Sequence, residues 1–450
     1  MIVAGVVTIP ATLSLIFLLH VGADPDPFDS AWAFLWGAVA VGLGLITAGI
    51  LHIVSLAWTG RRIAKVRLLR LSSIAHALVV VGVCSACFAM KAPPHAALSL
   101  PSPSGALAIG SVSLHLVDRS RWDPLAPTRT RRSLMVTLWY PALQTAAGTA
   151  AYLDRGVARV VDRELNVAAG TFETATSHAR TEAAAVVRKG RAYPVVIYSP
   201  GFGSWRNAST ALTEELVSRG FVVVTIDHPF DAAAVEFPNG TIVKARPLAV
   251  PANTKLLTFD AWDAMVKPFL SVRVDDVRFV LDVLETLNAG RNPDADRCSL
   301  PSHLAGALDL HRIGMFGHSL GGATTAQAMR IETRIRAGLS LDGPIPKVSK
   351  APCIEQPIML IRSVDPAIER LTVPSWKPSA AAVCAWCRAV ALTGSGHNDF
   401  TDLTVFAHQL ALGRRQRATW SLGSIDARKA VDAERRYVVT FFTRWLSGRN

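Results

Sequence analysis

Three long apolar stretches dominate the pattern of hydrophobic and polar positions at the start of the chain. They are Ile2–Val21, Ala31–Trp58 and Leu71–Met90. Each is long enough to cross about 30 Å of hydrocarbon as a helix. A signal peptide followed by buried helices is the alternative, but no basic segment precedes the first stretch. The pattern therefore favours an anchor of three transmembrane helices over residues 1–91.

The loops between these stretches differ in charge, and the difference predicts an orientation. Residues 22–30 contain three aspartates and no basic residue, whereas residues 59–70 contain five basic residues. Because basic loops stay in the cytoplasm, the chain after Met90 is expected to lie outside. We therefore predict a multi-pass protein of the cell membrane with a large extracytoplasmic part.

A different pattern follows a proline- and serine-rich segment at residues 92–105, which is typical of a tether. Residues 106–450 are predicted to form one folded domain. Two early segments, 106–117 and 133–142, have strand character and favour an antiparallel opening. The alanine-rich stretch 144–188 is expected to be helical or irregular.

From Pro194 onward, short apolar runs alternate with helical segments. The predicted strands contain PVVIYSPG, FVVVTIDHP, HRIGMFGHS, RAGLSLDG, PIMLIRS and RAVALTG. The predicted helices cover residues 209–220, 274–290 and about 426–446, and one more begins at Gly321. Strands that alternate with helices indicate an α/β domain with a mostly parallel sheet. In such sheets, ligands bind at the carboxyl ends of the strands.

Ser319 lies in the sequence GHSLG, Gly317–Gly321, between a predicted strand and a predicted helix. Glycines at both ends allow neighbouring chain to pass close to a tight turn, which exposes the serine hydroxyl above the sheet. A plain glycine turn is the alternative, but chance copies of the pattern seldom join a strand to a helix. We expect Ser319 to be a nucleophile. The N–H of Leu320, at the helix N-terminus, would stabilise an oxyanion.

A serine nucleophile needs a base, and histidine suits neutral pH. Downstream of Ser319 the chain contains only His397, in the loop sequence LTGSGHNDF, and His408, in a helical pattern. The loop position favours His397. For the acid that orients the imidazole, Asp342 and Asp365 each end a predicted strand, and spacing alone does not choose between them.

A second oxyanion donor is expected from the loop SPGFGSWR, which follows the strand ending at Tyr198. Gly201 and Gly203 permit an unusual backbone path, and the N–H of Phe202 is the candidate donor. A plain strand-to-helix turn is the alternative.

Two acidic segments have both a functional and a structural interpretation. DHPFD, Asp227–Asp231, is either a second acid–base site or pocket wall, or a capped turn after a strand, and we favour the capped turn. In VRVDDVR, Asp275 and Asp276 either bind a cation or belong to a salt-bridged helix start, and we favour the helix start.

Charge and cysteine content limit the partners. The net charge is +13, but no nucleic-acid motif accompanies it. No nucleic-acid partner is therefore expected. Four cysteines in an exported domain suggest up to two disulfides. The spacing of the cysteines does not determine which of them pair. The two cysteines of CAWC could also form a redox pair or half of a zinc site. Because no second CxxC accompanies them, we favour structural disulfides. Neither a metal nor a cofactor is expected. The four cysteines are Cys298, Cys353, Cys384 and Cys387.

The segments IYSPGFGSWR, GHSLGGAT, SLDGPI and GSGHNDFTD resemble those of the platelet-activating factor acetylhydrolase family, the plasma-type enzyme and its bacterial α/β-hydrolase relatives. The resemblance begins near residue 107 and implies an α/β-hydrolase fold. It implies Asp342 as the acid and Phe202 and Leu320 as oxyanion donors. It also implies metal-independent hydrolysis of short acyl esters on phospholipids, or of other esters in the bacterial relatives.

Two departures affect the acyl pocket that the resemblance implies. Leu320 replaces a phenylalanine often found after the family's serine, and LDGPIP lacks the aromatic residue that follows the acid in the animal enzyme. Phospholipid selectivity therefore does not follow from the resemblance. The predicted anchor is also foreign to the secreted enzymes.

Together, these features predict a membrane-anchored serine esterase that acts on an ester or lipid substrate through an acyl-enzyme. One alternative is a polyester or neutral-lipid esterase similar to cutinase-like hydrolases. Another is a membrane-bound binding protein whose hydrolase fold is catalytically inactive.

Overall fold

The structure is a computed structural model that describes residues 97–146, 148–188, 191–247, 259–344, 353–364 and 386–447. The chain divides into two units after Ala96, and the described residues belong to the second unit. The predicted anchor at residues 1–91 and most of the predicted tether lie outside these ranges. In the part that the structure describes, no helix is both long and apolar enough to cross a membrane.

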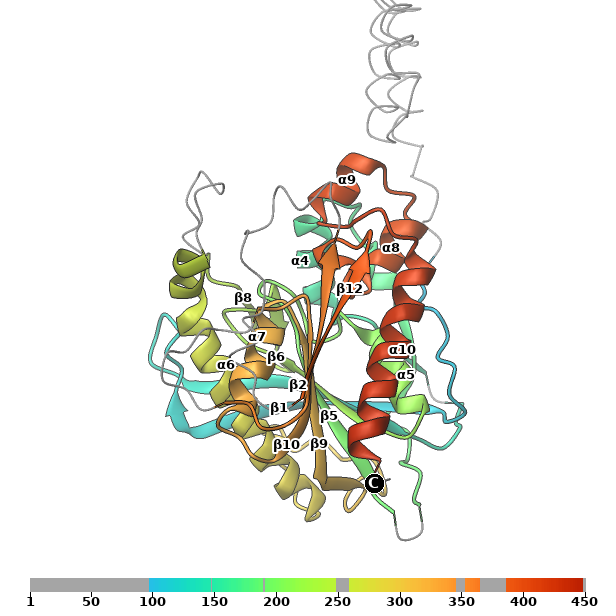
Figure 1. Ribbon diagram of the computed structural model, residues 1–450. Helices are drawn as coiled ribbons and strands as arrows, with labels where there is room; N and C mark the ends of the chain where they lie inside the picture. The colour runs from blue at the N-terminus through green and yellow to red at the C-terminus, as the bar shows by residue number, and fades with distance from the viewer. Residues whose placement is uncertain are drawn as a thin grey trace, which may run out of the picture. The chain divides into compact units, whose positions relative to one another are not determined.

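A mixed sheet forms the centre of this unit (Figure 1). Its strands are β1 (Ile109–Trp122), β2 (Arg131–Pro141), β3 (Thr149–Ala151), β4 (Thr176–Thr181), β5 (Tyr193–Ser199), β6 (Val222–Asp227), β9 (Leu308–His318), β10 (Ile335–Leu341), β11 (Ile358–Val364) and β12 (Cys387–Thr393). A separate hairpin joins β7 (Ala234–Glu236) to β8 (Ile242–Lys244).

The strand order is β12-β11-β10-β9-β5-β6-β2-β1-β4-β3. All neighbours from β12 to β6 are parallel. Strand β2 is antiparallel to both β6 and β1. The prediction of a mostly parallel α/β sheet with an antiparallel opening is therefore confirmed.

Helices cover both faces of the sheet (Figure 1). On one face lie α6 (Phe259–Asn288) and α7 (Leu320–Met329), and on the other lie α5 (Thr210–Ser218) and α10 (Ala427–Leu446). The predicted apolar stripe of α6 is buried: Val277, Leu281 and Leu284 pack with the sheet, each about 1 % exposed or less. The prediction of this buried helical face is therefore confirmed.

Short helices, three of which contribute to a further apolar cluster near α5, complete the described part of this unit. They are α4 (Arg155–Glu164), η1 (Phe172–Thr174), η4 (His397–Phe400), α8 (Leu403–Gln409) and α9 (Arg414–Thr419). Residues of α4, η1 and α8 pack around Trp205 and Trp420. The expectation that residues 144–188 lack strands is wrong, because β4 pairs with β1 and β3. These pairings come from distant segments, which an alanine-rich composition does not reveal.

The cysteines correct another prediction. Cys353 is disulfide-bonded, whereas Cys298 and Cys387 carry exposed free thiols. Cys384 lies outside the described residues. The preference for structural disulfides is therefore wrong for Cys298 and Cys387, since regular spacing along the chain does not reveal which sulfur atoms meet in the fold.

Candidate active site

Ser319 lies at a strained turn between β9 and α7. Its backbone has φ 55° and ψ −119°, a conformation rare for a residue with a side chain. A Cβ atom at Gly317 would lie 2.3 Å from the Gly321 backbone, and one at Gly321 would lie 1.9 Å from the Ser199 carbonyl oxygen. Only glycine fits at these two positions. The chain therefore forms the sharp elbow that the GHSLG pattern predicts.

The structure brings Ser319, His397 and Asp342 into one chain of hydrogen bonds, which we call the outer array. Ser319 Oγ lies 2.9 Å from His397 Nε2, and His397 Nδ1 lies 2.6 Å from Asp342 Oδ2. A carboxylate only accepts hydrogen bonds, so Nδ1 carries the hydrogen and Nε2 is left to accept the serine proton. The three residues follow β9, β10 and β12, where parallel strands end at one edge of the sheet.

Asp342 is held by its neighbour strand. The Ser363 N–H donates to Asp342 Oδ1 at 2.7 Å, and the Ser363 hydroxyl donates to Oδ2 at 2.9 Å. Burial alone would raise the pKa of the Asp342 carboxyl, but the hydrogen bonds from His397 and Ser363 hold that pKa below its ordinary value. Asp342 therefore remains a carboxylate beside the imidazole. The alternative acid, Asp365, lies outside the described residues.

The loop that carries His397 has supports that the sequence analysis missed. His318 Nε2 donates to the His397 carbonyl oxygen at 2.8 Å. Burial, with the adjacent His397 ring, lowers the pKa of His318 to about 3, so its imidazole is neutral. Asp399 accepts from the N–H groups of Gly396 and Gly423 at 2.8 and 2.6 Å. The place of His318 inside GHSLG, next to the nucleophile, was the one available signal.

The other downstream histidine, His408, is exposed on α8. It therefore lies on a helix surface, as the helical pattern around it predicts.

The candidate oxyanion donors flank the elbow. Leu320 is the first residue of α7, and Phe202 follows Gly201, where a Cβ atom would come within 3.3 Å of the Ser319 Cβ. Among the described residues, neither the Phe202 N–H nor the Leu320 N–H has a protein acceptor. Two N–H groups without an acceptor beside a nucleophile are the arrangement that stabilises a developing oxyanion.

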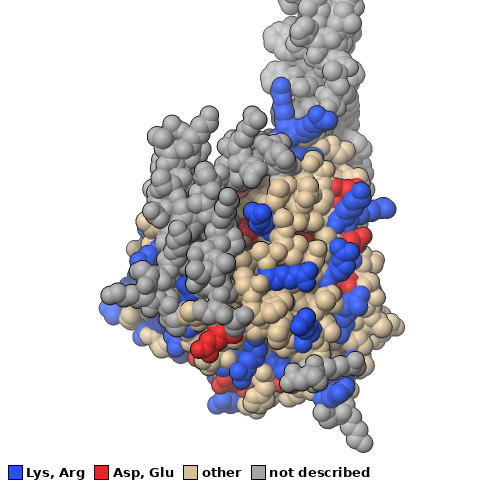
Figure 2. Space-filling view, in the orientation of Figure 1, with Lys and Arg blue, Asp and Glu red and all other residues tan. Residues whose placement is uncertain are grey.

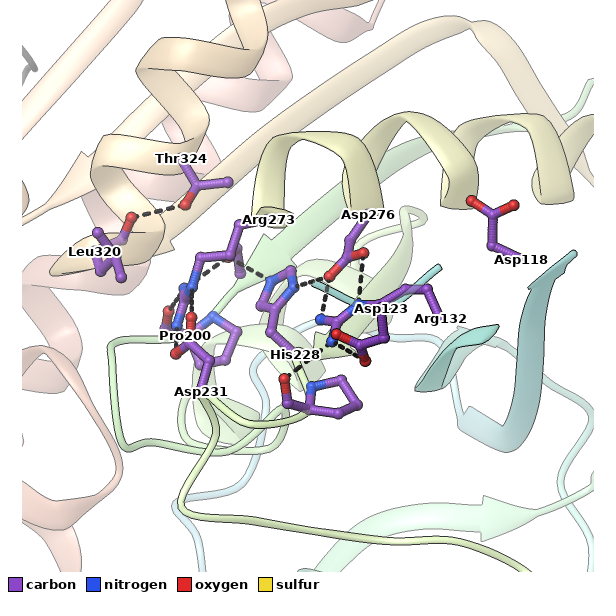
Figure 3. A network of polar contacts seen from close by, with 12 residues as sticks. Asp118, Asp123, Arg132, Pro200, His228, Asp231, Arg273, Asp276, Leu320 and Thr324 are labelled. Atoms are coloured by element: carbon purple, nitrogen blue, oxygen red, sulfur yellow. Dashed lines mark hydrogen bonds and ion pairs between the residues drawn. The ribbon is translucent and has the colours of Figure 1, made fainter. Parts of the chain in front are cut away.

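A second set of polar residues lies buried beside the elbow (Figure 3). Ser199 Oγ lies 3.0 Å from His228 Nε2, and His228 Nδ1 lies 3.0 Å from Asp276 Oδ2. We call these three residues the buried array, because none of them is more than 1 % exposed. It has the same residue types and atom order as the outer array.

Charges around the buried array hold it in one ionisation state. Burial alone would raise the pKa of Asp276, but Arg132 and His228 reverse this effect and hold that pKa below its ordinary value. Burial, together with the nearby Arg273, lowers the pKa of His228. The buried array therefore consists of a neutral imidazole and an ionised carboxylate.

Buried ion pairs account for carboxylates in both acidic segments. The interpretation of VRVDDVR as a helix start is wrong, because Asp276 lies buried in the middle of α6. Asp227 binds the buried Arg206, Asp231 binds Arg273, and Asp276 accepts from Arg132 and Arg121. Ion pairs, rather than a cation or a second acid–base site, thus explain these carboxylates. No cluster of His, Cys, Asp and Glu in the described part of the chain has the composition of a metal site.

The sheet, its helical layers and the serine elbow define the α/β-hydrolase class. Within that class, a profile of the family described as platelet-activating factor acetylhydrolase, isoform II, matches residues 124–449. The chain belongs to this family.

Individual relatives show how far the likeness extends. The chain is 30% identical over 259 residues to the probable 1-alkyl-2-acetylglycerophosphocholine esterase of Arthroderma benhamiae, covering 54% of this chain and 58% of that protein. It is 27% identical over 278 residues to the platelet-activating factor acetylhydrolase of Cavia porcellus, covering 58% and 59%. The chain thus spans less than two thirds of the length of both relatives.

A solved structure covers more of the chain. The ferulic acid esterase from Streptomyces cinnamoneus matches with a TM-score of 0.63 and 30% sequence identity, covering 79% of this chain and 94% of that chain.

Proposed function

We propose that this protein is a serine carboxylic ester hydrolase. The observation that carries the proposal is the unbroken hydrogen-bonded path from Ser319 through His397 to Asp342, which begins at a strained elbow. Ser319 is the nucleophile, His397 the general base and acid, and Asp342 the group that orients the imidazole. Membership of the family supports the same class of reaction.

The reaction proceeds in two acyl transfers. His397 Nε2 takes the Ser319 proton while Oγ forms a bond to the ester carbonyl carbon, and the Phe202 and Leu320 N–H groups bind the oxyanion. The C–O bond to the alcohol breaks, and His397 donates the proton to the leaving oxygen. Water then gives a proton to His397 and attacks the acyl-enzyme, which releases the acid and restores Ser319.

The surroundings of the oxyanion donors favour a short, uncharged acyl group. The rings of Phe202 and Phe269 lie edge to face, with centroids 5.0 Å apart. They belong to an apolar cluster with Leu125 and Leu320. An apolar wall of this kind accepts a small acyl chain and disfavours a charged one.

We propose short-acyl esters of the phospholipid type as the substrate class, as the names of the curated relatives suggest. Esters of ferulic acid are a second candidate, because the structural neighbour matches over nearly its whole length. A panel of p-nitrophenyl acetate, a 2-acetyl phospholipid, methyl ferulate, a neutral lipid and a polyester separates these candidates. The highest kcat/KM on methyl ferulate or on the polyester would reject the phospholipid assignment.

Labelling with a fluorophosphonate probe tests the reaction class. The wild-type chain should be labelled and should hydrolyse p-nitrophenyl acetate, and both properties should vanish in Ser319→Ala. A folded wild-type protein that is neither labelled nor active would instead support the catalytically inactive binding protein.

We also propose that the esterase is held at the cell membrane by residues 1–91, with the hydrolase outside the cytoplasm. The loop charges at residues 22–30 and 59–70 support this orientation. Separately, Lys and Arg spread over the described face that carries α10 while few acidic groups appear there (Figure 2), which bears on contact with a membrane but not on its side. A basic surface favours approach to anionic lipid. The full chain should stay in the membrane fraction after an alkaline wash, and protease added to intact cells should cleave it. Esterase recovered only in the soluble fraction would reject this location.

A further inference from the structure

Arg273 projects from α6 into the buried space beneath the loop that follows β5 (Figure 3). Its side chain is fully buried, and all five of its N–H groups have an acceptor. Nε and one Nη2 hydrogen go to the Asp231 carboxylate. The other Nη2 hydrogen goes to the Gly201 carbonyl at 3.1 Å, and Nη1 donates to the Pro200 carbonyl at 2.5 Å and to Ser199 Oγ at 3.2 Å.

The contact with Gly201 reaches the proposed oxyanion hole directly. The Gly201 carbonyl and the Phe202 N–H belong to one peptide unit, and a peptide unit is planar. A hydrogen bond that fixes the carbonyl therefore also fixes the direction of the N–H on the opposite side. The positive charge of Arg273 at the carbonyl oxygen also polarises the unit and makes the N–H a stronger donor.

Asp231 completes the support from the other side of Phe202. Its backbone carbonyl accepts from the Gly203 N–H at 2.9 Å, while its carboxylate aligns Arg273. The Gly201–Gly203 segment is therefore tied to the Arg273–Asp231 pair both before and after the proposed donor.

We propose that Arg273, aligned by Asp231, is a positioning residue that directs and polarises the Phe202 N–H toward the oxyanion. This inference rests on the proposed esterase function and adds a specific role within it. Because the oxyanion exists only in the transition state and the tetrahedral intermediate, loss of Arg273 should lower kcat and leave KM nearly unchanged.

The test compares Arg273→Lys with Arg132→Lys in the full chain. Arg132 is equally buried and is paired with two aspartates, whereas Arg273 is paired with Asp231, and the backbone acceptor of Arg132 is the Pro229 carbonyl. On p-nitrophenyl acetate, Arg273→Lys should lose about 10²-fold in kcat, since removing one oxyanion donor costs roughly 10²–10³-fold. Arg132→Lys should lose less than about fivefold at a similar decrease in melting temperature.

A trifluoromethyl ketone supplies a readout that general destabilisation does not change. It forms a tetrahedral adduct with the serine, so its inhibition constant should rise in Arg273→Lys by the same factor by which kcat falls. Asp231→Asn, which keeps the volume but weakens the alignment of Arg273, should show a smaller parallel change. If Arg273→Lys does not fold, the Asp231→Asn variant tests the role of Arg273 in its place.

The possible results separate this inference from the proposed function. Wild-type kcat in a folded Arg273→Lys, an unchanged inhibition constant, or an equal loss in Arg132→Lys would overturn the role of Arg273 and leave the esterase in place. Absence of Ser319-dependent activity in the wild-type chain would overturn the esterase itself.

Discussion

The outer and buried arrays contain the same three residue types in the same atomic order, yet we propose a reaction only for the outer array. Serine Oγ to Nε2 and Nδ1 to carboxylate distances are 2.9 and 2.6 Å in the outer array. Both distances are 3.0 Å in the buried array. Hydrogen-bond distances alone therefore do not distinguish a nucleophile from a structural serine.

The two serines differ first in backbone and access. Ser319 occupies a positive-φ turn that opens a helix, whereas Ser199 ends the buried strand β5. The His397 side chain is 26% exposed and the His228 side chain only 1%. Ser319 is partly exposed whereas Ser199 is fully buried, so we expect a substrate carbonyl to reach Ser319 and not Ser199.

The carboxylates differ in their partners. Besides His397, Asp342 accepts hydrogen bonds only from neutral groups of Ser363 among the described residues. In the proposed mechanism its negative charge is therefore available to stabilise the imidazolium formed during acyl transfer. Asp276 is already neutralised by Arg132 and Arg121. In the proposed mechanism, access, backbone geometry and local charge therefore decide which serine reacts, while residue type only permits the reaction.

The two serine substitutions should give the largest contrast. Ser319→Ala should lower kcat on p-nitrophenyl acetate by at least about 10⁴-fold with an unchanged melting temperature, since removal of a nucleophile leaves only residual catalysis. Ser199→Ala should instead lower stability by about 1–3 kcal/mol, because His228 and Arg273 lose a buried partner, and should keep fluorophosphonate labelling. Loss of labelling in a folded Ser199→Ala with labelling retained in Ser319→Ala would reverse the two assignments.

Substitution of the two aspartates, Asp342 and Asp276, should give the next largest contrast between loss of activity and loss of stability. Asp342→Asn should cost about 10⁴-fold in kcat, since the amide no longer stabilises the imidazolium, and should fold normally. Asp276→Asn should cost about 3 kcal/mol in urea unfolding, because the buried Arg132 loses one of its two carboxylate partners and keeps only Asp123. An active Asp342→Asn would remove Asp342 from the proposed mechanism.

The alternative acid, Asp365, supplies a matched control for that measurement. In the sequence pattern, each of the two aspartates comes at the end of a predicted strand. Asp365→Asn should lose less than about fivefold in kcat on the same ester. A loss as large as that expected for Asp342→Asn would move the acid one strand along.

The sequence predicted the outer array because its signals are local. The strand, GHSLG and helix adjoin one another around Ser319, and a loop position separates His397 from the helical His408. The resemblance to a known family favoured Asp342. The choices of Ser319 and His397 each needed only a few neighbouring residues, whereas the choice of Asp342 over Asp365 needed the resemblance.

The buried array had no comparable signal. His228 and Asp276 are 48 positions apart, and VRVDDVR is a charged pattern typical of a solvated helix start. Arg273 and Asp276 lie one helical turn apart on α6 and face the same buried space. Burial of such charges depends on acceptors from β5, β6 and the loops after them, which only the tertiary fold brings together.

The smallest expected effect is on the pH dependence of the free energy of unfolding. It comes from His228 in the buried array. The pKa of His228 is lowered by burial and by Arg273, while Asp276 and Asp231 oppose this shift. Unfolded histidine gains a proton as pH falls through about 6.5. The folded chain then binds fewer protons than the unfolded chain, so the free energy of unfolding decreases as pH falls below this value.

His228→Asn removes this contribution, so its free energy of unfolding should fall less between pH 7.5 and pH 5 than that of the wild type. The difference should reach about 1–2 kcal/mol, since each pH unit is worth at most about 1.4 kcal/mol per group. His408→Asn, at an exposed site on α8, serves as the control and should keep the wild-type pH dependence. If His228→Asn loses as much stability as the wild type, the pKa of His228 is the same in the folded and the unfolded chain. A smaller loss in the wild type than in His228→Asn would show instead that folding raises this pKa and that the buried array holds an imidazolium.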